Sequence, residues 1–234
     1  MIMPVISFIS SKGGAGKSTS AMVLAQALAN QNVGVSLIDA DPNQDNAGWG
    51  YAAGPRACLT IYPSSQDAPQ ITENTIQDVI EEASTKDPFV LVDLEGTASL
   101  LHSYAIAASD FVIIPMQGKY LDAKQTAKVV GLIRREGRAR RREIPHAVII
   151  TREPPAIKPR ALKRAVMQLD EHGIEQLYCR LAERDAYDAI YSASMTLYEL
   201  TQEIVNNPTA AIREANDFAA AVVMKMRKLK EAVA

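Results

Sequence analysis

The sequence predicts an α/β fold in which a doubly wound, mostly parallel β-sheet is flanked by helices. Short apolar runs of strand length recur along the chain, and helical patterns lie between them. The runs are rich in β-branched residues and almost continuously apolar, which is typical of central parallel strands that are covered on both faces. Strands that alternate with helices form βαβ units, so we expect helices on both faces of one sheet.

The elements follow one another in a regular order. Five apolar runs are predicted as strands, and they are residues 5–10, 33–39, 89–93, 111–115 and 146–151. Seven stretches are predicted as helices, and they are residues 19–30, 72–84, 98–108, 122–136, 158–172, 185–192 and 208–234. The proline-rich pieces 54–69 and 152–159 are too short to separate domains and are predicted as surface loops. We therefore expect residues 1–234 to form a single domain.

Composition and charge exclude several classes of protein. A chain of 234 residues that is 47% hydrophobic can bury roughly 70% of its unfolded surface, so it needs no disulfide or metal to fold. The net charge of −2 excludes a protein that holds nucleic acid by bulk positive charge, and any DNA contact must come from a local patch. Cys58 and Cys179 fit no metal-binding spacing, so we expect both to be reduced and buried. Neither a signal peptide nor a membrane-spanning run is present, which predicts a cytoplasmic protein.

The most specific motif lies where the first predicted strand ends. There VISFIS runs into SKGGAGKST, and a helical pattern follows. Glycines, a lysine and a hydroxyl between a buried strand and a helix form a Walker A loop, whose backbone N–H groups and helix N-terminus bind phosphate. Lys17 would reach the β- and γ-phosphates, Ser18 would bind Mg²⁺, and Thr19 would donate to the α-phosphate. The sequence thus predicts a P-loop NTPase with ATP and Mg²⁺ as cofactors; the alternative is a glycine-rich turn without a ligand.

One position of this loop departs from the general pattern. Ser11 stands where the first glycine is expected, and Lys12 precedes a pair of glycines. The run KGGAGKST resembles the deviant Walker A motif of the ParA/MinD/Soj family of ATPases. In that family the extra lysine contacts the nucleotide of the partner subunit, which implies that Lys12 couples ATP binding to formation of a homodimer; the alternative is a solvated loop lysine. The residues that the resemblance implies for ATP binding in the loop are Lys12, Gly13, Gly14, Ala15, Gly16, Lys17, Ser18 and Thr19.

Carboxylates follow two further strands. Asp39 and Asp41 lie in LIDADPN at the end of a predicted strand, where open α/β sheets place their ligands. Members of the ParA family carry DxDP at this point, which implies that Asp41 positions the attacking water and that Asp39 supports the Mg²⁺; an ordinary Asp-Pro turn is the alternative. Asp93 closes FVLVD and has the form of a Walker B aspartate that holds Mg²⁺. The implied catalytic residues are Lys12, Lys17 and Asp41, and the implied metal-binding residues are Ser18, Asp39 and Asp93.

Other candidate residues border this predicted site. Many ParA-like chains have two prolines after the Walker B aspartate, but this chain has Leu-Glu-Gly, and we expect Glu95 to be a solvated loop acid rather than a second carboxylate near the γ-phosphate. The segment HAVIITREPP resembles the family's strand and loop beside the adenine, which makes Arg152, Glu153 and Pro154 candidate base contacts; a loop without a ligand is an equal alternative. Arg184 is expected to contact the nucleotide or to pair with a buried acid.

Two basic stretches could supply a local DNA-binding patch. One is RREGRARRRE, and the other is KMRKLK on the last predicted helix. The candidate DNA-binding residues are Arg138, Arg140, Arg141, Arg142, Lys225, Arg227 and Lys228. Arginines also stabilise the C-terminal end of a helix, so a capping role is an alternative for the first stretch. The last helix carries an apolar stripe that includes Val222, Val223, Met226, Leu229 and Val233, which favours packing on the sheet.

The resemblance covers nearly the whole chain and is nearest to small plasmid-partition ParA proteins and the VirC-type ATPase of T-DNA transfer. It implies a slow, partner-stimulated ATPase that dimerises with ATP, binds DNA non-specifically and positions a plasmid or other cargo through a ParB-like adaptor. Such a protein would be cytoplasmic and nucleoid-associated. A MinD-like, membrane-cycling ATPase is one alternative, but the apolar stripe of the last helix has no Phe or Trp to anchor it in a membrane, so no stable membrane association is expected. A metabolic enzyme is another, although residues 94–135 lack the cysteines of an iron–sulfur relative.

Overall fold

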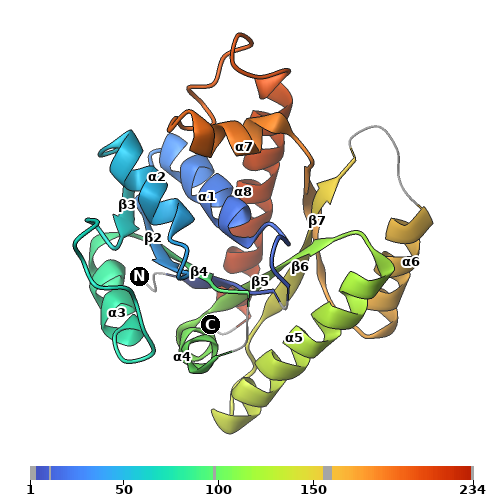
Figure 1. Cartoon of the computed structure of the whole chain (residues 1–234). Coiled ribbons are helices and arrows are strands. Elements are labelled where there is room, and N and C mark those ends of the chain that lie inside the picture. Colours follow the sequence, from blue (N-terminus) through green and yellow to red (C-terminus); the bar gives the residue numbers. More distant parts are fainter. Residues whose placement is uncertain (1–3, 11, 97–98, 155–159, 233–234) are drawn as a thin grey trace.

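A computed structural model describes residues 4–10, 12–96, 99–154 and 160–232 of the chain (Figure 1). Within these residues, seven parallel strands form one sheet in the order β3-β2-β4-β1-β5-β6-β7. The strands are β1 Val5–Phe8, β2 Val35–Ala40, β3 Leu59–Tyr62, β4 Phe89–Leu94, β5 Phe111–Gln117, β6 His146–Glu153 and β7 Gln176–Ala182. This is the doubly wound parallel sheet that the sequence predicts.

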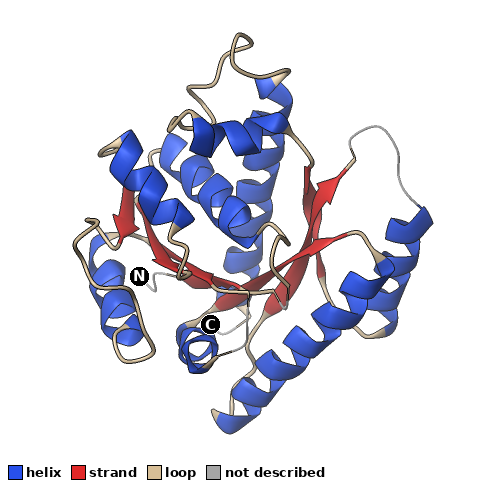
Figure 2. Ribbon diagram, in the orientation of Figure 1, coloured by secondary structure: helices blue, strands red, loops and turns tan. Residues whose placement is uncertain are grey.

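Helices cover both faces of the sheet (Figures 1 and 2). The helices are α1 Lys17–Asn30, α2 Asp45–Ala53, α3 Ile76–Lys86, α4 Leu100–Ala108, α5 Tyr120–Ala139, α6 Arg160–Glu171, α7 Asp185–Ser192 and α8 Pro208–Glu231. Helices α1, α2, α7 and α8 pack on one face, and α3, α4, α5 and α6 pack on the other. Of the predicted helices, parts of 98–108, 158–172 and 208–234 lie outside the described residues.

The two-sided burial explains the apolar runs of the sequence. Along β1, Ile6 and Phe8 pack into the core beside α1, whereas Val5 packs into the core on the opposite face. Successive side chains of a strand point to opposite faces, so a strand between two layers of helices needs apolar residues at every position.

The structure corrects the predicted elements in three places. Helix α2 is not predicted from the sequence, because DNAGWGYAA has two glycines and little amphipathic pattern. Strand β3 lies inside the stretch 54–69 that we expected to be a loop. Strand β7 is an edge strand whose alternate residues Tyr178 and Arg180 are exposed, so it lacks the continuous apolar pattern by which the other strands were recognised.

The expectation of two buried cysteines is also wrong in part. Both cysteines are free thiols, but Cys58 is exposed and Cys179 is half-buried. Cys58 lies in the turn before β3 and has a φ of 60°. It is therefore part of a surface turn and not of the core. Cys179 packs partly against the core beside α8.

The register of the strands brings the predicted site residues together. Asp39 of β2 is paired with Asp93 of β4, and Phe8 at the end of β1 is also paired with Asp93. Because all strands are parallel, their carboxyl ends and the loops that follow meet at one edge of the sheet. The glycine-rich loop and the carboxylates therefore lie at the same edge.

In the part of the chain that the structure describes, no helix has the length and apolar character that crossing a membrane requires.

Candidate nucleotide-binding site

The glycine-rich loop joins β1 to α1 and ends in a residue with left-handed backbone. Gly16 precedes the helix with a φ of 86°, a conformation that favours glycine. Lys17 is the first residue of α1 and is buried, with 6% of its surface exposed. Ser18 and Thr19 follow in the same turn and are half-buried. The helix N-terminus and the lysine thus contribute positive potential at one point, as phosphate binding requires.

Side chains from neighbouring strands fix the shape of this loop. The hydroxyl of Thr151, in β6, donates to the carbonyl of Ala15 at 2.7 Å, and Nε2 of Gln117, at the end of β5, donates to the carbonyl of Gly14 at 2.8 Å. The Ser10 hydroxyl donates to the carbonyl of Lys12 at 2.8 Å. Three loop carbonyls are therefore held by side chains, which keeps the loop curved without any ligand.

The segment after β4 also packs closely against the loop. A Cβ added to Gly96 would lie 3.2 Å from the backbone nitrogen of Gly13, so the two backbones approach as closely as glycine allows. Behind this contact, Nε2 of His102 lies 3.1 Å from the carbonyl oxygen of Glu95. Burial lowers the pKa of His102, which keeps its imidazole neutral at physiological pH. Gly96 thus allows the segment after β4 to contact the phosphate loop.

The two strand carboxylates are both buried. Asp39 is 1% exposed and Asp93 is 0% exposed. Burial raises the pKa of Asp39 to about 6, and burial together with the charge of Asp39 raises the pKa of Asp93 to about 8. One Asp39 oxygen accepts from the backbone nitrogen of Ala47 at 2.8 Å, which ties β2 to the start of α2. Two acids this close together favour a cation beside them, since a cation would stabilise their ionised forms.

The buried carboxylate of Asp93 tests whether Mg²⁺ fits this site. Its Oδ2 accepts from Nδ2 of Asn46 at 2.9 Å, whereas its Oδ1 is buried without a hydrogen-bond partner among the described residues. No group of three or more His, Cys, Asp or Glu side chains in the described part of the chain is placed to hold a metal. Mg²⁺ is usually held by one or two carboxylates, waters and the phosphates of a nucleotide, so Asp93 and the Ser18 hydroxyl fit this donor set.

Asp41 and Glu95 line a hollow next to these carboxylates. The hollow has a volume of about 580 Å³, and Asp39 lines it too. The Asp41 carboxylate accepts from the backbone nitrogen of Asn43 at 3.0 Å, so it also shapes the turn after β2. Glu95 is half-buried, which differs from the solvated loop acid that we expected.

A second hollow extends from the other end of the phosphate loop. Its volume is about 480 Å³, and its lining includes Thr19, Arg152, Tyr187 and Asp188. Pro154 is exposed and does not line it. Arg184 lines the hollow, and its guanidinium pairs with the carboxylate of Glu214 at 2.6 Å. The expected pairing of Arg184 with an acid is therefore confirmed. Glu153 instead pairs with Arg180 at 2.6 Å and is buried.

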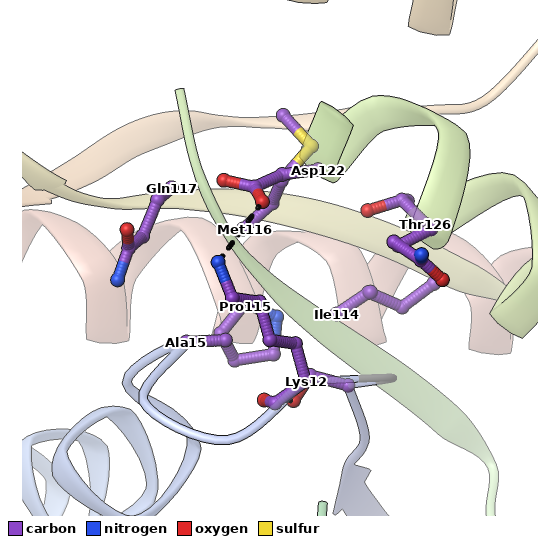
Figure 3. Close-up of a pocket in the computed structure, with 10 residues that line it drawn as sticks. Lys12, Ala15, Ile114, Pro115, Met116, Gln117, Asp122 and Thr126 are labelled. Atoms are coloured by element: carbon purple, nitrogen blue, oxygen red, sulfur yellow. Dashed lines mark hydrogen bonds and ion pairs between the residues drawn. The ribbon is translucent and has the colours of Figure 1, made fainter. Parts of the chain in front are cut away.

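Lys12 lies on the outer side of the loop and extends toward α5 (Figure 3). Its ammonium nitrogen is 3.7 Å from Oδ1 of Asp122, and its side chain is 57% exposed. Asp122 is 9% exposed, and its Oδ2 is buried without a partner among the described residues. Lys12 and Asp122 line a small cavity between β5, α5 and the loop, together with Met116 and Thr126 (Figure 3).

The family of the chain follows from a comparison with known proteins. The family model described as VirC1 protein matches residues 3–233. The chain belongs to the VirC1 protein family. A relative from Rhizobium radiobacter, Protein ParA, is 38% identical over 224 residues, which cover 96% of this chain and 98% of the relative. Protein virC1 of the same organism is 30% identical over 224 residues and covers 92% of this chain and 91% of its own.

Solved structures share the fold of this VirC1-family chain. A Borrelia burgdorferi plasmid partition protein bound to AMPPNP has a TM-score of 0.71 at 20% identity and covers 95% of this chain and 99% of its own. The septum site-determining protein MinD from Pyrococcus horikoshii, complexed with Mg-ADP, has a TM-score of 0.69 at 16% identity and covers 94% and 95%. The relatives confirm that the chain is ParA-like, as the loop sequence predicts, and the solved structures confirm the fold.

A second candidate site of the VirC1-family chain is a basic groove at the opposite edge of the sheet. We use "basic groove" for the hollow of about 1500 Å³ that both basic stretches line. The cationic residues that line it are Arg134, Arg138, Arg141, Arg142 and Lys225. Residues Arg140, Arg227 and Lys228, which the sequence also suggested for DNA binding, are exposed but do not line it. The fold thus joins two stretches that lie far apart in the sequence.

Several of these cations already have partners. Arg142 donates to the carbonyls of Ala107 and Ser109 at 2.6 and 2.9 Å, and so caps the C-terminal end of α4. Arg140 pairs with Glu136 at 2.7 Å, and Lys225 pairs with Glu175 at 2.6 Å. Arg142 therefore does cap a helix, but that helix is α4 and not the one that the basic stretch ends. Arg134, Arg138 and Arg141 are the groove residues most available to a ligand.

Sequence reasoning missed several residues of the nucleotide site. Thr151 and Gln117 end strands that were predicted, and a polar side chain at the end of an apolar strand could have identified both. Asn46 and Tyr191 were missed because α2 was not predicted, so nothing placed Asn46 beside Asp93. The packing of Gly96 against the loop had no sequence signal beyond the glycine itself.

Proposed function

We propose that this chain is a ParA-like partition ATPase that binds ATP and Mg²⁺, forms ATP-dependent homodimers and binds DNA non-specifically. In this proposal it positions or segregates a plasmid or another cargo through a ParB-like adaptor. The observation that carries the proposal is the buried Lys17 at the helix N-terminus beside the uncompensated Oδ1 of Asp93. The similarity to Protein ParA and to a nucleotide-bound partition protein supports it.

The geometry suggests how ATP would lie in the site. The β- and γ-phosphates would bind the backbone of Gly13, Gly14, Ala15 and Gly16 and the ammonium group of Lys17, and Thr19 would reach the α-phosphate. The base would enter the hollow that Arg152, Tyr187 and Asp188 line. Mg²⁺ would neutralise phosphate charge between the Ser18 hydroxyl and Asp93, while Asp39 supports this arrangement through α2.

Hydrolysis would use residues at the γ-phosphate end. Asp41 would position the attacking water, since it lines the hollow beside Asp39 and Glu95. Lys12 would leave Asp122 and contact the nucleotide of a partner subunit, where its charge would stabilise the transferring phosphoryl group. A site that needs a second subunit is incomplete in the monomer, so hydrolysis would be slow and open to stimulation by an adaptor.

The basic groove supports DNA as the surface that the dimer binds. Its cations come from α5, the turn that follows α5, and α8, and it lies apart from the nucleotide site. The apolar stripe of α8 does not favour a membrane partner, because Val222 is buried and Val223, Met226 and Leu229 pack against the core. The packing that we expected for this stripe is confirmed, apart from Val233, which lies outside the described residues. Under this proposal the protein is cytoplasmic and associates with the nucleoid.

The proposal is tested by measuring DNA binding at several salt concentrations with ATP, with ADP and without nucleotide. We expect tight DNA binding only when ATP and Mg²⁺ are both present, and we expect the affinity for DNA to fall steeply as the salt concentration rises. A Lys17→Ala variant serves as the control and is expected to bind no ATP and to bind DNA only weakly, as the wild type does without nucleotide. DNA binding that does not depend on nucleotide, or binding to anionic vesicles without binding to DNA, would contradict the proposal.

A further inference from the structure

A buried asparagine joins the carboxylates of the nucleotide site to helix α7. Asn46, which lies in the first turn of α2, is 0% exposed. Its Nδ2 donates to Oδ2 of Asp93 at 2.9 Å and lies 3.4 Å from the carbonyl oxygen of Ser18, and its Oδ1 accepts from the hydroxyl of Tyr191 at 2.8 Å. Each polar atom of this side chain therefore has a partner, and the partners lie in β4, α1 and α7.

The same helix α7 also lines the proposed base pocket. Tyr187 and Asp188 lie in α7 and line the hollow beside Thr19 and Arg152. A helix of 8 residues thus contacts the base pocket directly and the metal edge through Asn46. A buried asparagine that loses a hydrogen bond leaves an unsatisfied polar group, so Asn46 is constrained to move with Asp93 and Tyr191 together.

A natural reporter lies on this connection. Trp49 is the only tryptophan of the chain and lies in α2, three residues after Asn46. Its indole Nε1 donates to the carbonyl of Ile190, in the last turn of α7, at 3.0 Å and to that of Met195, three residues after α7 ends, at 3.2 Å. A shift of α2 against α7 changes these contacts, and with them the emission of Trp49.

We propose that Asn46 and Tyr191 are positioning residues that couple Mg²⁺ at Asp93 to the base pocket through α7. A cation bound at Asp93 would alter the hydrogen bond that Asp93 accepts from Asn46. A shift of the Asn46 side chain would then move Tyr191, and with it Tyr187 and Asp188 of the same helix. Such coupling is reciprocal, so a bound base also strengthens the binding of Mg²⁺. This inference rests on the proposed nucleotide-binding function and adds a route by which the two ends of the nucleotide affect each other.

The test uses the full chain with a matched pair of tyrosine variants. Tyr191→Phe removes the hydroxyl that donates to Asn46. Tyr198→Phe removes a hydroxyl that donates to Oδ1 of Asn216, in α8, at 2.7 Å, which is outside the hydrogen bonds that join Asp93, Asn46 and Tyr191, and it serves as the control. For each chain, Mg²⁺ is titrated into the ATP complex while Trp49 emission is recorded, and ATP affinity is measured by calorimetry with Mg²⁺ and with EDTA.

In the wild type we expect Mg²⁺ to shift Trp49 emission and to tighten ATP binding. In Tyr191→Phe the emission shift is expected to be mostly lost, and the tightening by Mg²⁺ to fall roughly three- to tenfold, the effect of one hydrogen bond. ATP affinity in EDTA should stay unchanged, which a general loss of folding would not produce. Asn46→Leu keeps the approximate size without adding charge and loses the hydrogen bonds to Asp93 and Tyr191, and it should show the same loss.

The outcomes separate the two proposals. A Tyr191→Phe chain that responds to Mg²⁺ like the wild type and like Tyr198→Phe would overturn the coupling and leave the nucleotide-binding function standing. A wild-type chain that binds no ATP, with or without Mg²⁺, would overturn the function itself.

Discussion

At the scale of single residues, two carboxylates of the site are buried side by side, where a cation would stabilise their ionised forms. Asp39 and Asp93 are adjacent in the register and buried, and both have pKa values above the ordinary value of 3.8. Burying two carboxylates together lowers the stability of the ligand-free protein, but the proposed Mg²⁺ site needs both of them. Asp93 has an unsatisfied oxygen at the place where Ser18 and the phosphate loop meet.

The raised pKa values predict how stability depends on pH in the absence of Mg²⁺ and nucleotide. Between pH 4 and about pH 8 the folded chain binds more protons at Asp39 and Asp93 than the unfolded chain does, so the free energy of unfolding falls as pH rises through this window. Asp93→Asn removes the larger shift. We expect this variant to melt several degrees above the wild type at pH 8, and the difference to shrink toward pH 5.

Melting curves recorded at each pH check this prediction, with the exposed Asp67→Asn as a control that follows the wild type. Saturating Mg²⁺ and ATP should reverse the order of the two chains, because the metal requires the ionised carboxylate. An Asp93→Asn variant that is less stable than the wild type at pH 8 without ligands would contradict the assigned direction.

At the scale of elements, the end of β7 and the start of α7 are anchored to α8 by one carboxylate. Glu214 accepts from the backbone nitrogen of Ala182 at 3.1 Å, from Nε and Nη2 of Arg184 at 3.0 and 2.6 Å, and from the hydroxyl of Tyr187 at 3.0 Å. The side chains of Arg184 and Glu214 are 17% and 15% exposed. This cluster holds the wall of the base pocket, since Arg184 and Tyr187 line it.

We therefore expect Glu214→Ala to lower the free energy of unfolding by about 2–4 kcal/mol, because it leaves a largely buried guanidinium and a backbone N–H without a partner. Glu175→Ala breaks another pair that α8 makes near β7, with Lys225, but Glu175 is 49% exposed. Its loss should cost less than about 1 kcal/mol. Urea unfolding of both variants gives the comparison, and equal losses would show that burial does not decide the contribution of the pair.

Elements also show where prediction from sequence succeeds. Strands β1, β2, β4, β5 and β6 were predicted because both of their faces are covered, and a continuous apolar run is a local signal of that. Edge strands β3 and β7 and helix α2 depend on neighbours that are distant in sequence. The phosphate loop, Asp39 and Asp93 could be found from motifs because these motifs, too, are local signals in the sequence. Asn46 could not, since its role arises only when α2 meets β4 and α7, and for Thr151 and Gln117 the one signal was a polar residue at the end of an apolar strand.

At the scale of the whole molecule, the nucleotide site and the basic groove lie at opposite ends of the sheet. Thr151 and Arg152, near the end of β6, line the proposed base pocket, whereas His146, at its start, lines the basic groove. Strand β6 has 8 residues, which span roughly 25 Å at about 3.3 Å per residue. ATP is therefore too far from the groove to contact DNA, and it can strengthen DNA binding by pairing two chains so that two grooves act together.

This arrangement predicts a specific defect for Lys12→Ala. The logarithm of DNA affinity falls linearly with the logarithm of salt concentration, with a slope set by the number of phosphates contacted, so a dimer with two grooves should show about twice the slope of the monomer. Lys12 is exposed and lies on the loop's outer side, so its loss should leave ATP binding to the monomer largely intact. We expect the variant to keep the shallow slope whether or not ATP is present. Calorimetry and DNA titrations at several salt concentrations measure both properties, and a Lys12→Ala chain whose slope doubles with ATP as in the wild type would show that this lysine does not link ATP to pairing of the grooves.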